Sequence, residues 1–203
     1  MNTSKIHPTA IVGDNVQIGE ETIIWDHAHI RSGTKIGHHS IIGEKSYLSN
    51  GVIVGNYVKI NAMVYIPYGV TIEDQCMVSS GVVFSNDAYP RSMNVELTDL
   101  QPSGPTAETM MTRVRQGATI GANASIGPGI TISQYALIGM GSVVTRNVPR
   151  QGLMVGNPAR LVGYVCVCGI KIVDFDAPPE DQMICTRCSR GYTWNEDQLV
   201  SIG

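Results

Sequence analysis

Aromatic and charged residues are both scarce in this chain. Of its 203 residues, 6% are aromatic and 15% are charged, whereas 22 are glycine. The formal net charge of −3 leaves no basic excess, so we expect no nucleic-acid partner. A composition that is rich in glycine but poor in aromatics and in charge is typical of an all-β fold with many tight turns, and not of a disordered chain.

Targeting and membrane signals are also missing. Residues Met1–His7 lack a basic stretch followed by an apolar segment, so we expect no secretory signal and a cytoplasmic location. Residues 117–145 contain no charged residue and are long enough to span a bilayer. Their density of Gly, Ser, Asn and Gln is unlike that of a lipid-facing helix, so we expect no membrane association. Without a signal, the five cysteines are expected to be reduced thiols or metal ligands.

Large apolar residues recur at every sixth position. Fourteen of them form an unbroken series from Ile6 to Phe84, and six more continue in the same register from Val114 to Val144. Small or β-branched residues occupy the position four residues after each, and glycine often follows the large residue, as expected if the chain turns a corner there. A six-residue period is that of a β-helix. Three hexads would make one triangular coil, which predicts six to seven coils with the large residues buried.

The repeat divides the chain into parts. Residues 1–149 are predicted to form the β-helix, 150–165 a connector and 166–203 a cysteine-rich tail. Residues 85–113 interrupt the repeat with an irregular segment that contains three prolines. This segment is either a tolerated surface insertion or a binding or active-site loop.

Short sequence motifs in this chain resemble those of a known family. The repeat [Ile/Leu/Val]-Gly-x-x-[small]-x resembles that of the hexapeptide-repeat acyltransferases, which implies a left-handed parallel β-helix. Within residues 5–165, three strings resemble bacterial sugar-nucleotide N-acetyltransferases: Ile24-Trp25-x-x-x-His29-Ile30, Phe84-Ser85-Asn86-Asp87-x-Tyr89-Pro90-Arg91 and Val155-Gly-Asn-Pro-Ala-Arg160.

That resemblance implies an acetyl-CoA-dependent N-acetyltransferase. The implied acceptor is the 3-amino group of UDP-2-acetamido-3-amino-2,3-dideoxyglucuronate, in the biosynthesis of a surface polysaccharide such as lipopolysaccharide. The string Ser85-Asn86-Asp87-x-Tyr89-Pro90-Arg91 resembles a related branch, which acts on dTDP-3-amino-3,6-dideoxyhexoses, about as well. An O-acetyltransferase is a further alternative. The family also implies a homotrimer whose active sites lie between subunits. Two competing interpretations come from other classes of protein: a non-catalytic β-helix and a carbonic-anhydrase-like zinc protein.

The positions of the histidines bear on the reaction. Many hexapeptide-repeat O-acyltransferases use a histidine base, but none of the five histidines follows residue 39. This absence argues against O-acetyl transfer and against the anhydrase-like reading. An amine needs less help, because the departing thiolate, with a thiol pKa near ~8.5, can take up the surplus proton. We therefore expect Asn86 to orient the sugar or the acetyl carbonyl without acting as a base. An asparagine that caps the turn before Pro90 is the alternative.

Further residues are candidates for the site. His29 is a second catalytic candidate, or else a surface or inter-subunit histidine. The guanidinium groups of Arg31 and Arg91 suit a carboxylate or a pyrophosphate, with exposed, solvated arginines as the alternative. The full set of predicted substrate-binding residues is Arg31, Asn61, Asp87, Tyr89 and Arg91. The predicted acetyl-CoA-binding residues are Gly121, Ala122, Gly139, Met140, Arg146, Pro158 and Arg160.

Four of the five cysteines form two close pairs. Cys166 and Cys168 are separated from Cys185 and Cys188 by 16 residues, a pattern that suits a tetrahedral Zn²⁺ site. We predict one structural zinc ion in a small zinc-ribbon-like tail, which is otherwise too small to hold a core. A metal-free tetrathiol or a redox pair is the alternative. Cys76 occupies a small position of the repeat and is expected in the core.

Overall fold

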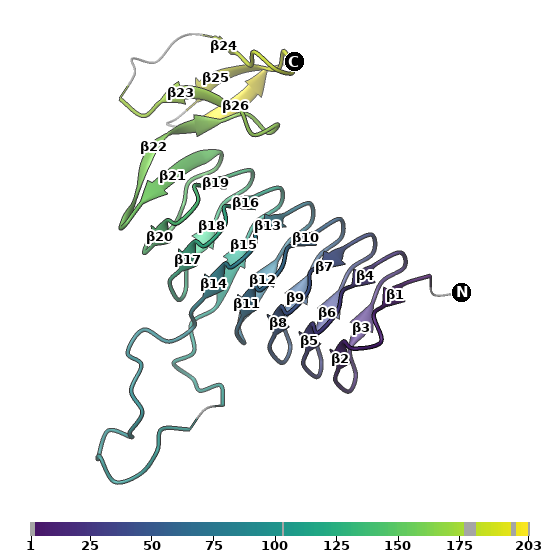
Figure 1. Cartoon of the computed structure of the whole chain (residues 1–203). Helices are drawn as coiled ribbons and strands as arrows, with labels where there is room; N and C mark the ends of the chain where they lie inside the picture. Colours follow the sequence, from purple (N-terminus) through teal and green to yellow (C-terminus); the bar gives the residue numbers. More distant parts are fainter. Residues whose placement is uncertain (1–2, 103, 177–181, 196–197, 203) are drawn as a thin grey trace.

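A computed structural model describes residues 3–102, 104–176, 182–195 and 198–202. The remaining residues, which fall within the predicted β-helix, its inserted loop and the tail, lie outside the described part. The described residues form 26 strands and no helix, which confirms the all-β class (Figure 1). It follows that none of these residues belongs to a helix long and apolar enough to cross a bilayer.

Twenty short strands wind into a parallel β-helix with three faces. Within each face, a strand pairs in parallel with the strand of the next coil, as β1 does with β4 through Lys5↔Ile23 and Ile6↔Ile24. Face A contains β1 (Lys5–Ile6), β4 (Ile23–Ile24), β7 (Ile41–Ile42), β10 (Lys59–Ile60), β13 (Met77–Val78), β16 (Thr119–Ile120) and β19 (Leu137–Ile138). Face B contains β2 (Ile11–Val12), β5 (His29–Ile30), β8 (Tyr47–Leu48), β11 (Tyr65–Ile66), β14 (Val83–Phe84), β17 (Ser125–Ile126) and β20 (Val143–Val144). Face C contains β3 (Gln17–Ile18), β6 (Lys35–Ile36), β9 (Ile53–Val54), β12 (Val70–Ile72), β15 (Thr112–Val114) and β18 (Thr131–Ile132).

These strands make six coils and most of a seventh, as the repeat predicts. The third side of the last coil is reduced to an isolated parallel bridge, Ile132↔Val148. Every large apolar repeat residue from Ile24 to Val144 is buried. In the first coil, Ile6 and Val12 are exposed because this coil lies at the end of the stack.

Serine residues at the small positions of the repeat form hydrogen bonds through their hydroxyl groups. The Ser40 hydroxyl donates to the Gly55 carbonyl at 3.0 Å and accepts the Val58 N–H of the next coil at 3.0 Å. Ser46 makes the corresponding pair of hydrogen bonds with Asn61 and Val64. A serine can therefore be fully buried beside the apolar core, because it links one coil to the next.

The turn glycines have a different role from the predicted one. The left-handed residue of each turn is the third residue after the large apolar one, and it is often not glycine, as at His27, Lys45 and Met63. The glycine directly after the large residue is needed for close approach between coils. A Cβ on Gly43, for example, would lie 2.5 Å from the Asn61 carbonyl carbon and 2.6 Å from the Ala62 nitrogen.

The connector and the start of the tail continue face A. Strand β21 (Gly152–Gly156) pairs with β19 in parallel and with β22 (Ala159–Val165) antiparallel, and β22 pairs in turn with β23 (Lys171–Asp174). Strands β24 (Met183–Ile184), β25 (Gly191–Asn195) and β26 (Gln198–Ile202) form a separate antiparallel sheet. The tail therefore contains a three-stranded sheet, in which β26 pairs along the whole of β25.

The inserted segment leaves the β-helix at the corner between faces B and C. It runs from β14 to β15 and extends far from the coils (Figure 1). Its two ends are joined where the Met110 N–H donates to the Asn86 carbonyl at 3.2 Å. Beyond this neck its apolar side chains are exposed, including Tyr89, Val95 and Leu97.

Candidate functional site

Asn86 is half-buried at the neck of the inserted loop. Its side-chain Nδ2 donates to the Tyr68 carbonyl one coil away at 3.0 Å, and its own carbonyl accepts from Met110. The first bond orients the side-chain amide, and the second holds the backbone at the neck of the loop. Among the described residues no donor reaches Oδ1, so this oxygen is available to accept a hydrogen bond from a bound molecule.

The neighbouring candidates lie on the loop itself. The Asp87 carboxylate accepts the Tyr89 N–H at 2.8 Å, which makes a local turn. The Arg91 guanidinium donates to the Pro90 carbonyl at 2.8 Å, and the Tyr89 side chain is 86% exposed. These three residues are close to Asn86 in sequence, and the side chains of Asp87 and Arg91 are held by local bonds.

His29, Arg31 and Asn61 lie apart from Asn86 within one chain. His29 is on face B in β5, where its ring packs edge-on against Tyr47 at 5.3 Å between centroids. Strand β5 is three positions from β14 on that face, or about 14 Å at the usual spacing between strands. Arg31 follows β5 at the same distance, and Asn61 is at the corner between faces A and B. A single chain does not bring these residues together with Asn86.

Most of the predicted acetyl-CoA residues gather at the corner between faces A and B. Gly121 with Ala122, and Gly139 with Met140, are turns of adjacent coils, joined where the Gly141 N–H donates to the Ala122 carbonyl at 2.8 Å. A Cβ on Gly121 would lie 2.6 Å from the Met140 nitrogen, so the two coils approach each other closely here, and the Met140 side chain is 81% exposed.

The turn between β21 and β22 joins the same corner. The Gly156 N–H donates to the Ser142 hydroxyl at 3.2 Å, and Val155, which pairs with Arg160, lies against Gly139. This places Pro158 and Arg160 near the two glycine turns. Arg146, in contrast, follows β20 at the opposite edge of face B.

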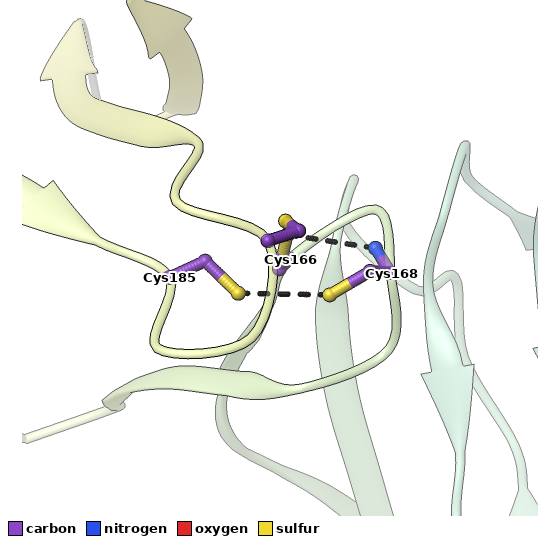
Figure 2. Close-up of side chains that lie close together, drawn as sticks. Cys166, Cys168 and Cys185 are labelled. Carbon is purple, nitrogen blue, oxygen red and sulfur yellow. Dashed lines mark hydrogen bonds between the residues drawn. The ribbon is translucent and has the colours of Figure 1, made fainter.

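The four tail cysteines do come together. Their Sγ atoms all lie within 4.8 Å of one another, with Cys166 and Cys188 at 3.4 Å and Cys168 and Cys185 at 3.6 Å. Figure 2 shows the sulfurs of Cys168 and Cys185 facing each other across the two turns. These distances exceed a disulfide bond of about 2.05 Å. They match the separation of about 3.8 Å between sulfurs that surround zinc tetrahedrally at about 2.3 Å.

The local environment shifts the pKa values of these thiols in different directions. The backbone N–H of Arg190 lowers the pKa of Cys188 to about 6, and the N–H groups of Cys188 and Arg187 lower the pKa of Cys185. Burial raises the pKa of Cys166 to about 12. Burial likewise raises the pKa of Cys76 to about 12, in agreement with its predicted place in the core.

Sequence reasoning missed residues that support both groups. Tyr68 holds Asn86 through its carbonyl, and it precedes Asn86 by 18 residues, so the coil period itself is a signal for this pairing. The Tyr192 hydroxyl lies 3.1 Å from the Cys166 sulfur and accepts the Val167 N–H at 3.2 Å. The sequence does not indicate this role, because it identifies Tyr192 only as an apolar residue of the tail.

Comparisons with known families identify the repeat. Residues 15–50 match the bacterial transferase hexapeptide model (six repeats), and residues 33–68 and 113–146 match the hexapeptide repeat of succinyl-transferase. Together these matches cover less than half of the chain.

One relative and two solved structures are similar to this chain. The dTDP-3-amino-3,6-dideoxy-alpha-D-galactopyranose 3-N-acetyltransferase of Aneurinibacillus thermoaerophilus is 46% identical over 90 residues, which cover 44% of this chain and 44% of the relative. The UDP-N-acetylglucosamine O-acyltransferase of Moraxella catarrhalis RH4 aligns with a TM-score of 0.55 at 17% identity, covering 81% of this chain and 74% of the other. A point mutant of AntD, an N-acyltransferase from Bacillus cereus, aligns with a TM-score of 0.54 at 18% identity, covering 81% of this chain and 82% of the other. At these identities the two structures show the shared fold.

Proposed function

We propose, from the premise that this chain is a hexapeptide-repeat protein with the left-handed β-helix of acyltransferases, that it transfers an acetyl group from acetyl-CoA to a sugar amine. The acceptor is the 3-amino group of a nucleotide-linked amino sugar, used in making a surface polysaccharide. The observation that carries this proposal is the 46% identity over 90 residues with a 3-N-acetyltransferase. The chain spans less than half of that relative's length.

The preferred acceptor is a dTDP-3-amino-3,6-dideoxyhexose. The similar A. thermoaerophilus enzyme acts on a dTDP-linked 3-amino sugar, which supports this alternative over the UDP-linked uronate favoured by the sequence strings. The 3-amino group is common to both candidates, so the reaction is the same for either.

Asn86 serves as an acceptor of a hydrogen bond in this reaction. Because its Nδ2 is engaged by the Tyr68 carbonyl, Oδ1 is the atom that can hold an N–H of the sugar amine. The neutral amine nitrogen attacks the thioester carbonyl, the carbon–sulfur bond breaks, and the departing thiolate takes the surplus proton of the nitrogen. An amide oxygen has no useful basicity, so Asn86 orients the amine and removes no proton.

Acetyl-CoA is proposed to bind along the corner of Gly121, Ala122, Gly139 and Met140, beside Pro158 and Arg160. Asn86 lies at the other edge of face B, so one chain alone does not bring donor and acceptor together. A neighbouring subunit would supply the second wall of the site, which supports the proposed homotrimer. Tyr65 and Val83 on face B, 45% and 47% exposed, offer apolar surface for that contact.

The proposed location follows from this scheme, whereas a second cofactor is proposed from the tail cysteines. Since acetyl-CoA and nucleotide sugars are cytoplasmic metabolites, we place the protein in the cytoplasm. A zinc ion held by the four tail cysteines is proposed as a structural cofactor that takes no part in acetyl transfer.

Incubation of the full chain with acetyl-CoA and a panel of nucleotide sugars tests the reaction. We expect mass spectrometry to find one acetyl group on the dTDP-linked 3-amino sugar and none on the matched 3-hydroxy sugar. Equal acetylation of the hydroxy sugar, or no transfer to any 3-amino sugar, would overturn the proposed reaction. Preferential acetylation of the UDP-linked uronate would overturn only the choice of acceptor.

The variant Asn86→Ala tests the role of the amide. Loss of one hydrogen bond worth about 1.4 kcal/mol predicts a fall of about tenfold in kcat/KM. The shape of the pH profile should stay unchanged, because no base is lost. Asn94→Ala is the matched control, since the Asn94 side chain bonds only within the loop, to Thr98 and Asp99. Full activity of the Asn86 variant would remove this residue from the site.

A further inference from the structure

Two similar turns present the four tail cysteines. In the turn between β22 and β23, the Gly169 N–H donates to the Cys166 carbonyl at 2.8 Å. In the turn before β25, the Ser189 N–H donates to the Cys185 carbonyl at 2.9 Å. Gly169 and Ser189 both have a positive φ, 91° and 58°. In each turn, the N–H of the residue after the second cysteine therefore donates to the carbonyl of the first cysteine, although one pair is Cys-x-Cys and the other is Cys-x-x-Cys.

Hydrogen-bond donors surround the sulfurs. The Cys168 N–H donates to the Cys166 sulfur at 3.5 Å, and the Arg190 guanidinium donates to the Cys188 sulfur at 3.3 Å. The Tyr192 hydroxyl is 3.1 Å from the Cys166 sulfur. Donors that lie next to the sulfurs hold them in place, as groups around a metal-binding site do for its ligands. Cys166 and Cys185 are almost fully buried, and several thiolates in one buried cluster need a cation to compensate their charge.

We infer that Cys166, Cys168, Cys185 and Cys188 bind one Zn²⁺ ion as a closed tetrathiolate site, and that this ion holds the tail sheet against the end of the β-helix. Four protein ligands complete a tetrahedral shell and leave no position for water, so the site is structural. The inference goes beyond acetyl transfer and does not depend on it.

The position of the site explains why a metal is needed there. Cys166 and Cys168 follow β22, which continues face A, whereas Cys185 and Cys188 belong to the separate sheet of β24, β25 and β26. The ion would therefore link the turn after β22, which belongs to the sheet of face A, to the separate sheet of β24, β25 and β26. A cavity of about 290 Å³ lies between the Cys166–Gly169 turn and Tyr135 and Thr119 of the β-helix, so packing alone does not fill the space beneath this turn.

Metal analysis of the full chain, purified without added metal, is the direct test. We expect about one zinc per chain, lost in Cys185→Ser and kept in the matched control Cys76→Ser, whose thiol lies in the β-helix core. Metal-free protein whose tail is ordered would overturn the inference. Iron in place of zinc, seen by its visible absorption, would overturn the identity of the ion.

Cobalt substitution keeps the inference testable if the cysteine variants fail to fold. Titration of the chelated wild-type chain with Co²⁺ should end at one equivalent per chain, with the visible and sulfur charge-transfer bands of a tetrahedral tetrathiolate. Weak bands of an octahedral ion would overturn it.

Trp194, which packs edge-on against Tyr164 at 4.9 Å, reports on the tail through its fluorescence in a Trp25→Phe background. Chelation should shift this fluorescence, and Zn²⁺ should restore it. Unchanged fluorescence would overturn the clamping role. Acetyl transfer measured in parallel separates a failed metal site from a failed acetyltransferase assignment.

Discussion

The β-helix and the tail stabilise their strands in different ways. Most strands of the β-helix have two residues, yet each lies between coils that bury the same kind of side chain, such as Ile60 between Ile42 and Val78. The tail has no repeat. Its separate core consists of Cys166, Met183, Cys185, Tyr192 and Leu199, of which two are predicted metal ligands. A repeat supplies its own neighbours, whereas a short non-repetitive segment needs a crosslink.

The largest expected effect lies in the β-helix core. Ile60→Asp should abolish cooperative folding, because it places an unpaired carboxylate at a position with no solvent exposure. Lys59→Asp is the matched control, since the adjacent side chain points to solvent. Circular dichroism during thermal unfolding checks both variants. If the Ile60 variant melted like the parent, the inward assignment of the repeat would be wrong.

A smaller effect is expected where coils touch. Gly43→Ala should destabilise the β-helix by about 1–3 kcal/mol, because the new Cβ would meet backbone at 2.5 Å. Gly104→Ala in the inserted loop has open space around it and should leave stability unchanged. Urea unfolding followed by circular dichroism compares the two. Equal stabilities would contradict the close-approach role of the turn glycine.

In the tail, Tyr192→Phe should cost about 1–2 kcal/mol, because the Val167 N–H loses its acceptor and the Cys166 sulfur loses a partner. This loss should stay within the tail. Hydrogen exchange of Val167 and its neighbours should become faster, while exchange in the coils stays as in the parent. Faster exchange throughout the β-helix would show that the two regions unfold together.

The smallest effect is a pH dependence from Cys76. Burial raises the pKa of this thiol to about 12, whereas the unfolded chain releases the proton near ~8.5. Its contribution to stability is therefore complete below the unfolded pKa and is lost as pH rises toward the folded value. Between neutral pH and about pH 10, the wild type should lose more stability than Cys76→Ala, as measured by urea unfolding. Equal losses would contradict the burial of the thiol.

Much of this architecture was predictable because its signals are local and periodic. Each large residue from Ile24 onward points inward as the six-residue period predicts, and the cysteine spacing predicts the observed cluster. The site was less predictable. Asn86 is oriented by a backbone carbonyl, which residue type does not encode, and His29 and Arg31 are coils away from it although their strings resemble one family.

The sequence by itself determined the β-helix, its coil number and the grouping of the four cysteines, because large residues at every sixth position can all be buried in a stack of coils and the spacing of the two cysteine pairs suits one tetrahedral cluster. Tertiary structure alone decided the rest. The turn glycines are required by the next coil and not by their own φ, which only the stacking reveals. The tail joins face A through β22 because strand pairing depends on which edge is free, and that edge exists only once the coils are stacked.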